Sequence, residues 1–163
     1  MCSLSIKQDF KNDDQYNTPK EAWEMIIPFI PKNVTIWEAF MMGNTSSKSM
    51  DYLSELGCDV VGSPELDFFE NDLGDVIVSN PPYSIKKRIF KRLADLDKPF
   101  ILLLPVSTIT KQFTKLLKRE FIQMIIPDKR IQFMKGEDPL KRCWFDTMFL
   151  CYKMNLKNDI TFI

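Results

Sequence analysis

The residues best suited to chemistry lie in the segment SNPPYS, residues 79–84, directly after the apolar run DVIV. Two adjacent prolines cannot continue a helix and cannot pair inside a central strand, so we expect a turn that ends a strand. In this turn Asn80 offers a side-chain carbonyl oxygen, and Pro81 offers a backbone carbonyl held by its rigid ring. The segment therefore presents two hydrogen-bond acceptors at a strand end.

Two acceptors beside an aromatic ring suit the chemistry of a planar amine such as N6 of adenine. The lone pair of this nitrogen is delocalised into the ring, so acceptors that take its N–H hydrogens draw the nitrogen towards tetrahedral geometry. Tyr83 adds a face on which a base can stack, worth about 1–3 kcal/mol in nucleic-acid systems. The chain has no histidine, which argues against hydrolases that use a histidine base and against most metal hydrolases. We therefore expect chemistry that needs little proton shuttling.

Cap signals and apolar patterns divide the remaining chain into alternating strands and helices. Thr18 is expected at a helix N-cap, with Pro19 in the first helical position and Glu21 placed for a capping box. Gly57 is expected to end a second helix. The patterns predict strands at 33–40, 58–62, 75–79, 100–106, 121–127, 130–134 and 145–154, and helices at 19–27, 47–56, 84–96 and 108–119.

This alternation predicts an α/β fold, namely a three-layer, doubly wound domain with a mainly parallel sheet and an antiparallel C-terminal strand pair. Ligands of such sheets bind beyond the carboxyl ends of the strands, near the point where the strand order reverses. The turns EAFMMGN and SNPPYS both follow predicted strands, so we expect them to face one cleft. We expect residues 1–15 to form a flexible arm and residues 16–163 to form a single domain.

Composition limits the kinds of protein that the chain can be. Its 163 residues, 45% of them hydrophobic, are enough for one sizeable core. The four cysteines form no CxxC pair, and we predict neither a metal site nor a disulfide framework. No stretch approaches about 20 consecutive apolar residues, so the expectation is a soluble, intracellular protein without a membrane partner.

Charge is segregated along the chain although the net charge is zero. Residues 1–83 hold 5 lysines and arginines against 14 acidic residues, whereas residues 84–135 hold 13 against 4. A basic half can give a polyanion a local footprint, and the alternative is a set of lysine-rich helix faces that simply meet solvent. The candidate nucleic-acid-binding residues share the predicted helix 84–96 and are Lys86, Lys87, Arg88, Lys91 and Arg92.

The order of these motifs resembles a known family. NPPY after a buried strand, with a TP segment before it and a strand ending in EAF followed by a glycine, resembles the S-adenosylmethionine-dependent amino-methyltransferases. The resemblance is strongest to the DNA N6-adenine methyltransferases of the small, Dam-like phage and viral type, with the gamma order of motifs and no recognition domain. RIQF followed by FDTMFLCY also resembles the terminal strand pair of those enzymes. The resemblance implies a Rossmann-like methyltransferase fold.

Carried over residue by residue, the resemblance implies S-adenosyl-L-methionine as cofactor and direct displacement at its methyl group. The residues that would hold the target amine are Asn80, Pro81, Pro82 and Tyr83. Those that would bind the cofactor are Asn17, Thr18, Pro19, Glu38, Phe40, Gly43, Asp67 and Phe68. Asp67 and Phe68 would bond and stack its adenine, and the segment 17–19 would contact its methionine part.

The chain departs from the family pattern in ways that keep other functions open. Thr45 stands where these enzymes usually carry a second glycine, and Ser63 stands where an acid usually binds the cofactor ribose, with Glu65 as the nearby carboxylate. One alternative is therefore a methyltransferase-fold protein that binds nucleic acid or a partner without catalysis. Another is an enzyme that methylates RNA or a protein glutamine. For a DNA substrate, recognition would come from the loop 134–144, the basic helix or a partner subunit, and the target base would have to flip out of the duplex.

Overall fold

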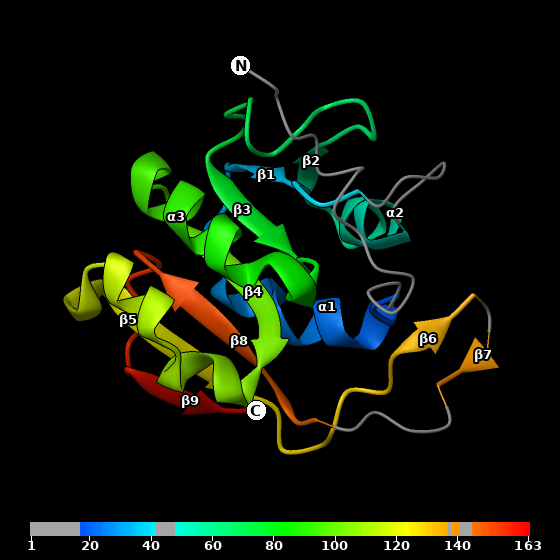
Figure 1. Cartoon of the computed structure of the whole chain (residues 1–163). Coiled ribbons are helices and arrows are strands. Elements are labelled where there is room, and N and C mark those ends of the chain that lie inside the picture. The colour runs from blue at the N-terminus through cyan, green and yellow to red at the C-terminus, as the bar shows by residue number, and fades with distance from the viewer. Residues whose placement is uncertain (1–16, 42–47, 137, 141–144) are drawn as a thin grey trace.

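The computed structural model describes residues 17–41, 48–136, 138–140 and 145–163, so the predicted arm at 1–15 lies outside the described residues. A seven-stranded sheet forms the centre, in the order β2-β1-β3-β4-β8-β5-β9, and β6 and β7 form a separate antiparallel pair (Figure 1). The strands are β1 Thr35–Trp37, β2 Asp59–Val61, β3 Val76–Ser79, β4 Phe100–Pro105, β5 Ile122–Ile126, β6 Met134–Lys135, β7 Asp138–Pro139, β8 Thr147–Tyr152 and β9 Ile160–Phe162.

The strand directions confirm the predicted α/β class with a mostly parallel central sheet. β1 is parallel to both β2 and β3, and β3 is parallel to β4. β8 is antiparallel to both of its neighbours, β4 and β5. The sequence predicted an antiparallel C-terminal strand pair, and the later strand of that pair, β8, lies inside the sheet between two strands of the opposite direction. The arrangement is compatible with a Rossmann-like fold.

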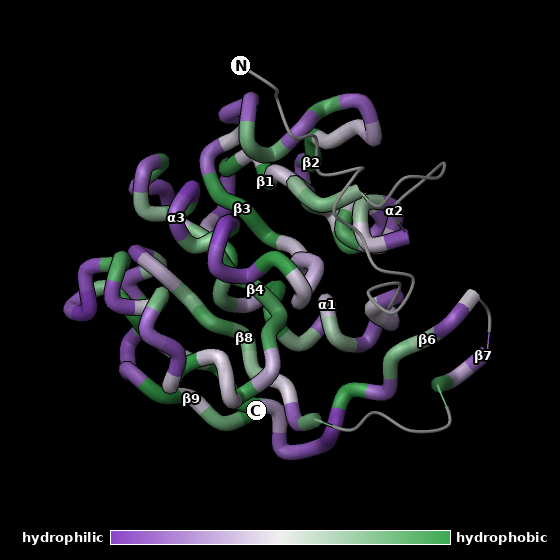
Figure 2. Tube along the Cα trace, in the orientation of Figure 1, coloured by the Kyte–Doolittle hydropathy of each residue, from purple (hydrophilic) through white to green (hydrophobic). Residues whose placement is uncertain are grey.

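Two apolar clusters follow the alternation of side chains along the strands. Ile77, Leu102 and Leu150 belong to one cluster, together with residues of α3 (Lys86–Leu96). Their neighbours in sequence, such as Val78, belong to the other cluster, together with residues of α1 (Lys20–Ile26) and α2 (Lys48–Glu55). Successive strand residues point to opposite faces, so both faces of the central strands are buried, which explains their unbroken apolar runs (Figure 2).

The helix predicted at 108–119 is wrong. The chain instead makes the 3₁₀ turns η5 Val106–Thr110, η6 Gln112–Leu116 and η7 Arg119–Phe121. Threonine hydroxyls bond nearby carbonyls there, from Thr110 to Ser107 at 2.9 Å and from Thr114 to Lys111 at 2.7 Å. Lys111 itself is extended, with φ −78 and ψ 144. Local hydroxyl bonds of this kind compete with the helical backbone pattern, and the apolar spacing alone did not reveal them.

The capping box predicted at Thr18 is also wrong. Helix α1 has Pro19 as its N-cap and no side-chain cap, and the 3₁₀ turn η3 (Ile27–Phe29) continues it. Thr18 is 2% exposed, and within the described residues its hydroxyl makes no hydrogen bond. The side chain points into the fold instead of towards the helix end, because burial of this segment overrides the local cap signal. By contrast, Gly57 follows α2 with a φ of 87, as its predicted role as a helix stop requires.

The strand predicted at 130–134 is almost absent, and two strands were missed. Only Met134 of that range is in a strand, and it also forms an isolated bridge with Asn17. Ile131 and Phe133 are buried in the second apolar cluster, so their apolar alternation reflects packing rather than pairing. The missed strands are β7, which pairs with β6, and β9, which pairs in parallel with β5 at the sheet edge. Among the described residues, no helix combines the length and apolarity needed to cross a membrane.

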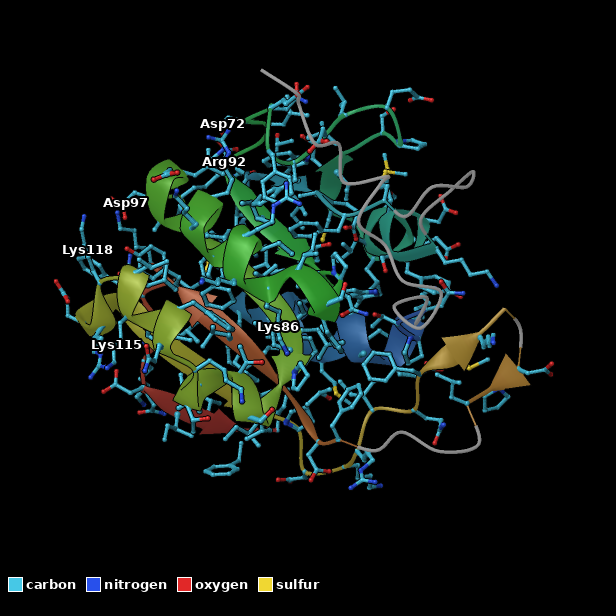
Figure 3. All side chains as sticks on the ribbon, in the orientation of Figure 1. Asp72, Lys86, Arg92, Asp97, Lys115 and Lys118 are labelled. Atoms are coloured by element: carbon cyan, nitrogen blue, oxygen red, sulfur yellow. The ribbon has the colours of Figure 1, made fainter. Side chains whose placement is uncertain are left out.

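A polar cluster closes the end of α3 over the sheet. Asp97 follows the helix in the left-handed region, with φ 47. Tyr152 Oη donates to Asp97 Oδ1 at 2.7 Å, and the ammonium group of Lys153 lies 2.6 Å from Oδ2. The ammonium group of Lys118 lies 3.0 Å from the same oxygen, and Figure 3 labels Asp97 and Lys118. Hydrogen bonds from Lys153, Tyr152 and Lys118 hold the pKa of Asp97 well below its usual range. Burial, followed by the bond to Asp97, raises the pKa of Tyr152 to about 12.

The Asp97→Asn variant tests this cluster, because asparagine tolerates the left-handed conformation but carries no charge. We expect a lower free energy of unfolding at neutral pH. The folded-state pKa of Asp97 lies below the unfolded value of about 3.9, so its contribution is present above that pH and is lost as the pH falls through the folded-state pKa. Urea denaturation at neutral and acidic pH measures the difference, with Asp95→Asn on the exposed side of α3 as control. A difference from wild type that grows on acidification would contradict the assignment.

Candidate functional site

The candidate site is built around the point where the strand order reverses, at β1. From β1 the chain passes to β2 on one side of it, and then to β3 on the other side. Crevices in sheets of this kind lie outside the carboxyl ends of the two strands that flank the reversal. The residues that follow β1 and β3 are the segments beginning at Glu38 and at Asn80. The two turns that the sequence predicted to face one cleft therefore leave neighbouring strands at the same edge.

Glu38 joins the ends of three strands. Its side chain is 2% exposed, and Oε1 accepts a hydrogen bond from the hydroxyl of Ser79, the last residue of β3. The same oxygen accepts the backbone N–H of Phe40 at 3.2 Å, and the N–H of Glu38 donates to the carbonyl of Val61 in β2 at 2.9 Å. The carboxyl group is thus engaged with the protein itself, in the position where sequence predicted a cofactor contact.

The loop after β2 approaches Glu38 closely. A Cβ added at Gly62 would lie 2.7 Å from the carbonyl oxygen of Glu38 and 3.0 Å from the sulfur of Met41, so only glycine fits there without a shift. Beyond Gly62, the hydroxyl of Ser63 donates to the carboxylate of Glu65. The carboxylate that stands nearest to the expected ribose position is therefore bonded within its own loop.

The SNPPYS segment forms the expected turn at the end of β3. Asn80 is half-buried, Pro81 and Pro82 are buried, and the 3₁₀ turn η4 begins at Tyr83. Tyr83 Oη donates to the carbonyl of Leu103 in β4 at 3.3 Å. Its ring meets Phe145 edge-on at 5.5 Å. The turn is therefore braced against β4 through Tyr83, and its asparagine follows directly on the serine that bonds Glu38.

The segment of Asn17, Thr18 and Pro19 is held by the strand that begins the separate pair. Asn17 and Met134 exchange two backbone hydrogen bonds, each of 2.9 Å. Within the described residues, the hydrogen bonds of this segment lead to β6 and to α1 rather than to Glu38 or Asn80. The hydroxyl of Thr18 is buried and has no hydrogen-bond partner within the described residues. Phe40 is 4% exposed and packs on Phe68.

Phe68 is a core residue. It is 0% exposed, and its ring lies against Phe40 at 4.6 Å, Phe69 at 5.4 Å and Trp37 at 5.6 Å. Asp67 Oδ1 accepts the N–H of Phe69 at 2.8 Å, which organises the turn that carries both residues. A stacking contact between Phe68 and a cofactor adenine would require the ring to leave this set of aromatic neighbours. Gly43 and Thr45 of the predicted cofactor loop lie outside the described residues.

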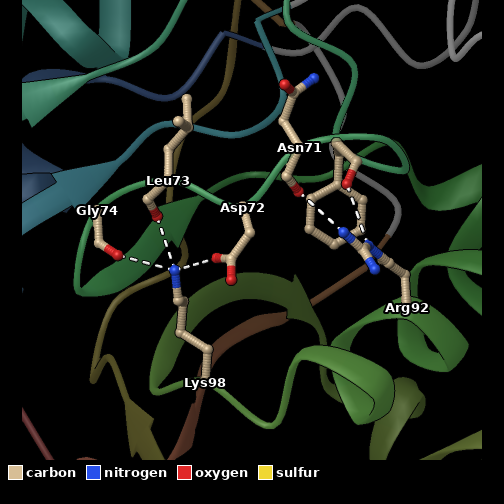
Figure 4. A network of polar contacts seen from close by, with 7 residues as sticks. Asn71, Asp72, Leu73, Gly74, Arg92 and Lys98 are labelled. Carbon is tan, nitrogen blue, oxygen red and sulfur yellow. Dashed lines mark hydrogen bonds and ion pairs between the residues drawn. The ribbon is translucent and has the colours of Figure 1, made fainter.

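The basic residues of α3 divide into two groups. Arg92 donates to the carbonyls of Asn71 at 3.0 Å and Phe68 at 3.4 Å (Figure 4). Arg88 lies 4.5 Å over the ring of Phe69. These two arginines hold the loop after β2 against the helix. Lys87 and Lys91 are exposed, and Lys86 lies 5.3 Å over the ring of Tyr83. The lysines are therefore the members of the predicted set that face solvent or the candidate site.

Sequence reasoning missed Ser79 in the candidate site and Lys98 at the opposite end of β3. Lys98 donates to the carbonyls of Gly74 at 2.8 Å and Leu73 at 2.9 Å and pairs with Asp72, so it fixes the start of β3 (Figure 4). Its charge in a polar loop gave no usable signal. Ser79 did give one, because it is a hydroxyl at the end of an otherwise apolar strand. In the part of the chain that the structure describes, no group of three or more acidic or cysteine side chains could hold a metal ion.

The Ser79→Ala variant tests the link between β1 and β3. Removal of the hydroxyl leaves a buried carboxyl oxygen with one donor fewer, so we expect a loss of about 1–3 kcal/mol in the free energy of unfolding. Ser54→Ala, on the exposed surface of α2, is the matched control and should change stability little. Chemical denaturation of the three proteins makes the comparison, and equal losses in both variants would remove the special role of Ser79.

Comparison with known proteins adds no relative to this description: no family model matches the chain, and no curated protein matches it.

Proposed function

We propose that the chain is an S-adenosylmethionine-dependent methyltransferase that acts on an exocyclic amine, with N6 of adenine in DNA as the favoured target. The observation that carries the proposal is the placement of the Glu38 and Asn80 segments at neighbouring strand ends, on the two sides of the strand-order reversal. Within this proposal the domain has the three-layer, doubly wound arrangement of the methyltransferase fold. Apolar clusters on both faces of the sheet support that arrangement.

The roles of the residues follow from their chemistry. When bound, the cofactor supplies an electrophilic methyl group. Asn80 and the carbonyl of Pro81 accept hydrogen bonds from the target amine and orient its lone pair, so positioning supplies most of the rate enhancement. The buried prolines and the bond from Tyr83 to Leu103 keep the turn rigid, which lowers the cost of ordering it on binding.

Some of the residues expected to bind the cofactor are free to do so, and others are already engaged within the protein. The unbonded, buried hydroxyl of Thr18 supports a contact from the segment 17–19. Glu38 would act on the cofactor mainly by fixing the loop after β1, because its Oε1 is already an acceptor for Ser79 and Phe40. Adenine stacking is better assigned to partly buried Phe69 than to Phe68, whose ring is enclosed.

A second candidate function has its own support. The full burial of Phe68 and the bond of Ser63 to Glu65 favour a methyltransferase-fold module that binds nucleic acid or a partner without a cofactor. Isothermal titration with S-adenosylmethionine separates the two proposals. Heat of binding supports the enzyme, and its absence at millimolar cofactor leaves the binding module.

The Asn80→Ala variant tests the amine site. We expect methyl transfer from labelled cofactor to DNA to fall by about 10²–10³-fold, the usual effect of removing one positioned hydrogen-bonding group, while cofactor affinity is retained. Asn158→Ala, at an exposed position of the loop before β9, is the matched control. RNA and protein substrates are assayed beside DNA, since transfer to one of these alone would move the substrate assignment. Unchanged transfer by Asn80→Ala would show that the amine site is wrongly placed.

The division of the basic helix predicts which residues contact nucleic acid. Lys87 and Lys91 are exposed, so Lys87→Gln with Lys91→Gln should lower the slope of log affinity against log salt by about 2, close to one per phosphate contact. Arg92→Gln should instead reduce stability, because Arg92 holds the carbonyls of Phe68 and Asn71. Lys32→Gln, before β1, is the control. A salt slope unchanged by the double lysine variant would remove α3 from the interface.

A further inference from the structure

The segment between β4 and β5 carries positive charge without a balancing negative charge. Residues 106–119 hold four basic residues and no acidic one. They form the turns η5 and η6 and lead into η7, and all four basic side chains are exposed: Lys111, Lys115, Lys118 and Arg119. Lys118 pairs with Asp97, whereas the other three take part in no ion pair within the described residues. Three cations of one short segment are thus available to a ligand.

This segment lies beside α3 on one face of the sheet. The ring of Phe113 in η6 lies 4.9 Å from the ring of Phe90 in α3, and Leu117 belongs to the same apolar cluster as Phe90 (Figure 1). Helices α1 and α2 belong to the other cluster, and together they carry four acidic residues against two basic ones. The face that α3 and residues 106–119 cover is therefore the basic face of the sheet.

Two lysines of α3 lie on the side of the helix that is nearer to η6. Arg88 and Arg92 contact the loop between β2 and β3. Successive helix residues are about 100° apart around the axis, so Lys87 and Lys91, each directly before one of these arginines, lie on the side nearer to Phe90. The exposed cations of the two elements therefore form one surface. We call this surface the basic strip, and its members are Lys87, Lys91, Lys111, Lys115 and Arg119.

The basic strip begins at the edge of the sheet that carries the candidate site. β4 is parallel to β3, with Leu102 level with Ser79, so both strands end at the same edge. The SNPPYS turn leads from β3 into α3, and η5 follows β4 directly. Both elements of the strip therefore start beside the candidate amine site and continue from it over the same face.

We propose that the basic strip binds the phosphate backbone of the DNA whose target base occupies the candidate amine site. The inference rests on the proposed function, and it extends the contact from α3 to η5–η7, which sequence reasoning did not assign. Phosphate contacts position a nucleic acid on a protein without reading its sequence. The exposed side chains of Ser107 and Gln112 lie in the same segment and can donate to phosphate oxygens beside the cations.

The side chains of the strip favour a nucleic acid over a lipid surface. An element that lies on a membrane buries a continuous apolar face and keeps its basic residues around it. The exposed large apolar side chains within residues 106–119 are Val106 and Leu116, which stand far apart in the segment, and α3 contributes none among its described residues. The strip is therefore polar along its length, as contact with phosphates requires.

Fluorescence anisotropy with a labelled DNA duplex, over a range of salt and without cofactor, tests the strip. Lys111→Gln with Lys115→Gln should make the slope of log affinity against log salt shallower by about 2, close to one per phosphate contact. Lys111→Arg with Lys115→Arg keeps both charges and should bind like wild type. Lys32→Gln with Lys157→Gln removes equal charge from exposed positions outside the strip. A slope that the Lys111 and Lys115 glutamine variant changes no more than this control would overturn the proposal.

A combined variant tests whether α3 and η6 contact the same DNA. Adding Lys87→Gln and Lys91→Gln to Lys111→Gln and Lys115→Gln should make the slope shallower by about 4, because each phosphate contact that is lost releases one counterion fewer. A change no larger than that of either pair alone would contradict a single continuous strip.

Methyl transfer separates this inference from the proposed function. Salt-dependent DNA binding through the strip, without methyl transfer by wild type, would remove the enzyme and support the strip. Methyl transfer that Lys111→Gln with Lys115→Gln leaves unchanged at low DNA concentration would support the enzyme and overturn the strip. Binding to phosphatidylserine vesicles that Leu116→Ser abolishes, without binding to DNA, would overturn it in favour of a lipid surface.

Discussion

A buried carboxyl group at the reversal of strand order ties three strand ends together. Glu38 receives the hydroxyl of Ser79 from β3 and the N–H of Phe40 from its own loop, and its backbone bonds β2. Burial of a carboxyl group is costly unless hydrogen bonds replace its hydration, so these donors are required for the arrangement to exist. The hydrogen bond between Ser79 and Glu38 also fixes the position of the turn that begins at Asn80, because Asn80 follows Ser79 directly in the chain.

Charged residues of α3 and of the segment that follows it stabilise the scaffold as well as offering binding. Arg92 and Lys98 both donate hydrogen bonds to backbone carbonyls of the loop between β2 and β3. This loop contains no helix or strand. Charge-assisted bonds of this kind are stronger than those between neutral groups, and they order a loop that few apolar contacts could fix. Some of the basic residues in this half of the chain thus have a structural role. The exposed lysines do not, and they are the residues available to bind a polyanion.

The two edge strands of the central sheet, β2 and β9, carry different kinds of side chain. At one edge, Asp59 of β2 accepts the hydroxyl of Thr35 at 2.6 Å and places charge beside the strand. At the other edge, β9 exposes Ile160 and Phe162 without such protection. The two edges of the central sheet therefore differ in character, because one carries a charged side chain and the other exposes two apolar ones.

The sequence by itself determined the elements whose signals are local. Pro81 and Pro82 forced a turn after an apolar strand, Gly57 ended a helix, and apolar runs marked β3, β4 and β8, because chain stiffness and burial act on neighbouring residues. Tertiary structure alone decided what depends on residues far apart in sequence. It turned Thr18 inward, enclosed Phe68 among aromatic rings and bonded Ser79 to Glu38 across 41 positions. Packing and hydrogen-bond partners of this kind are fixed only when the sheet assembles, so no pattern within a short window could reveal them.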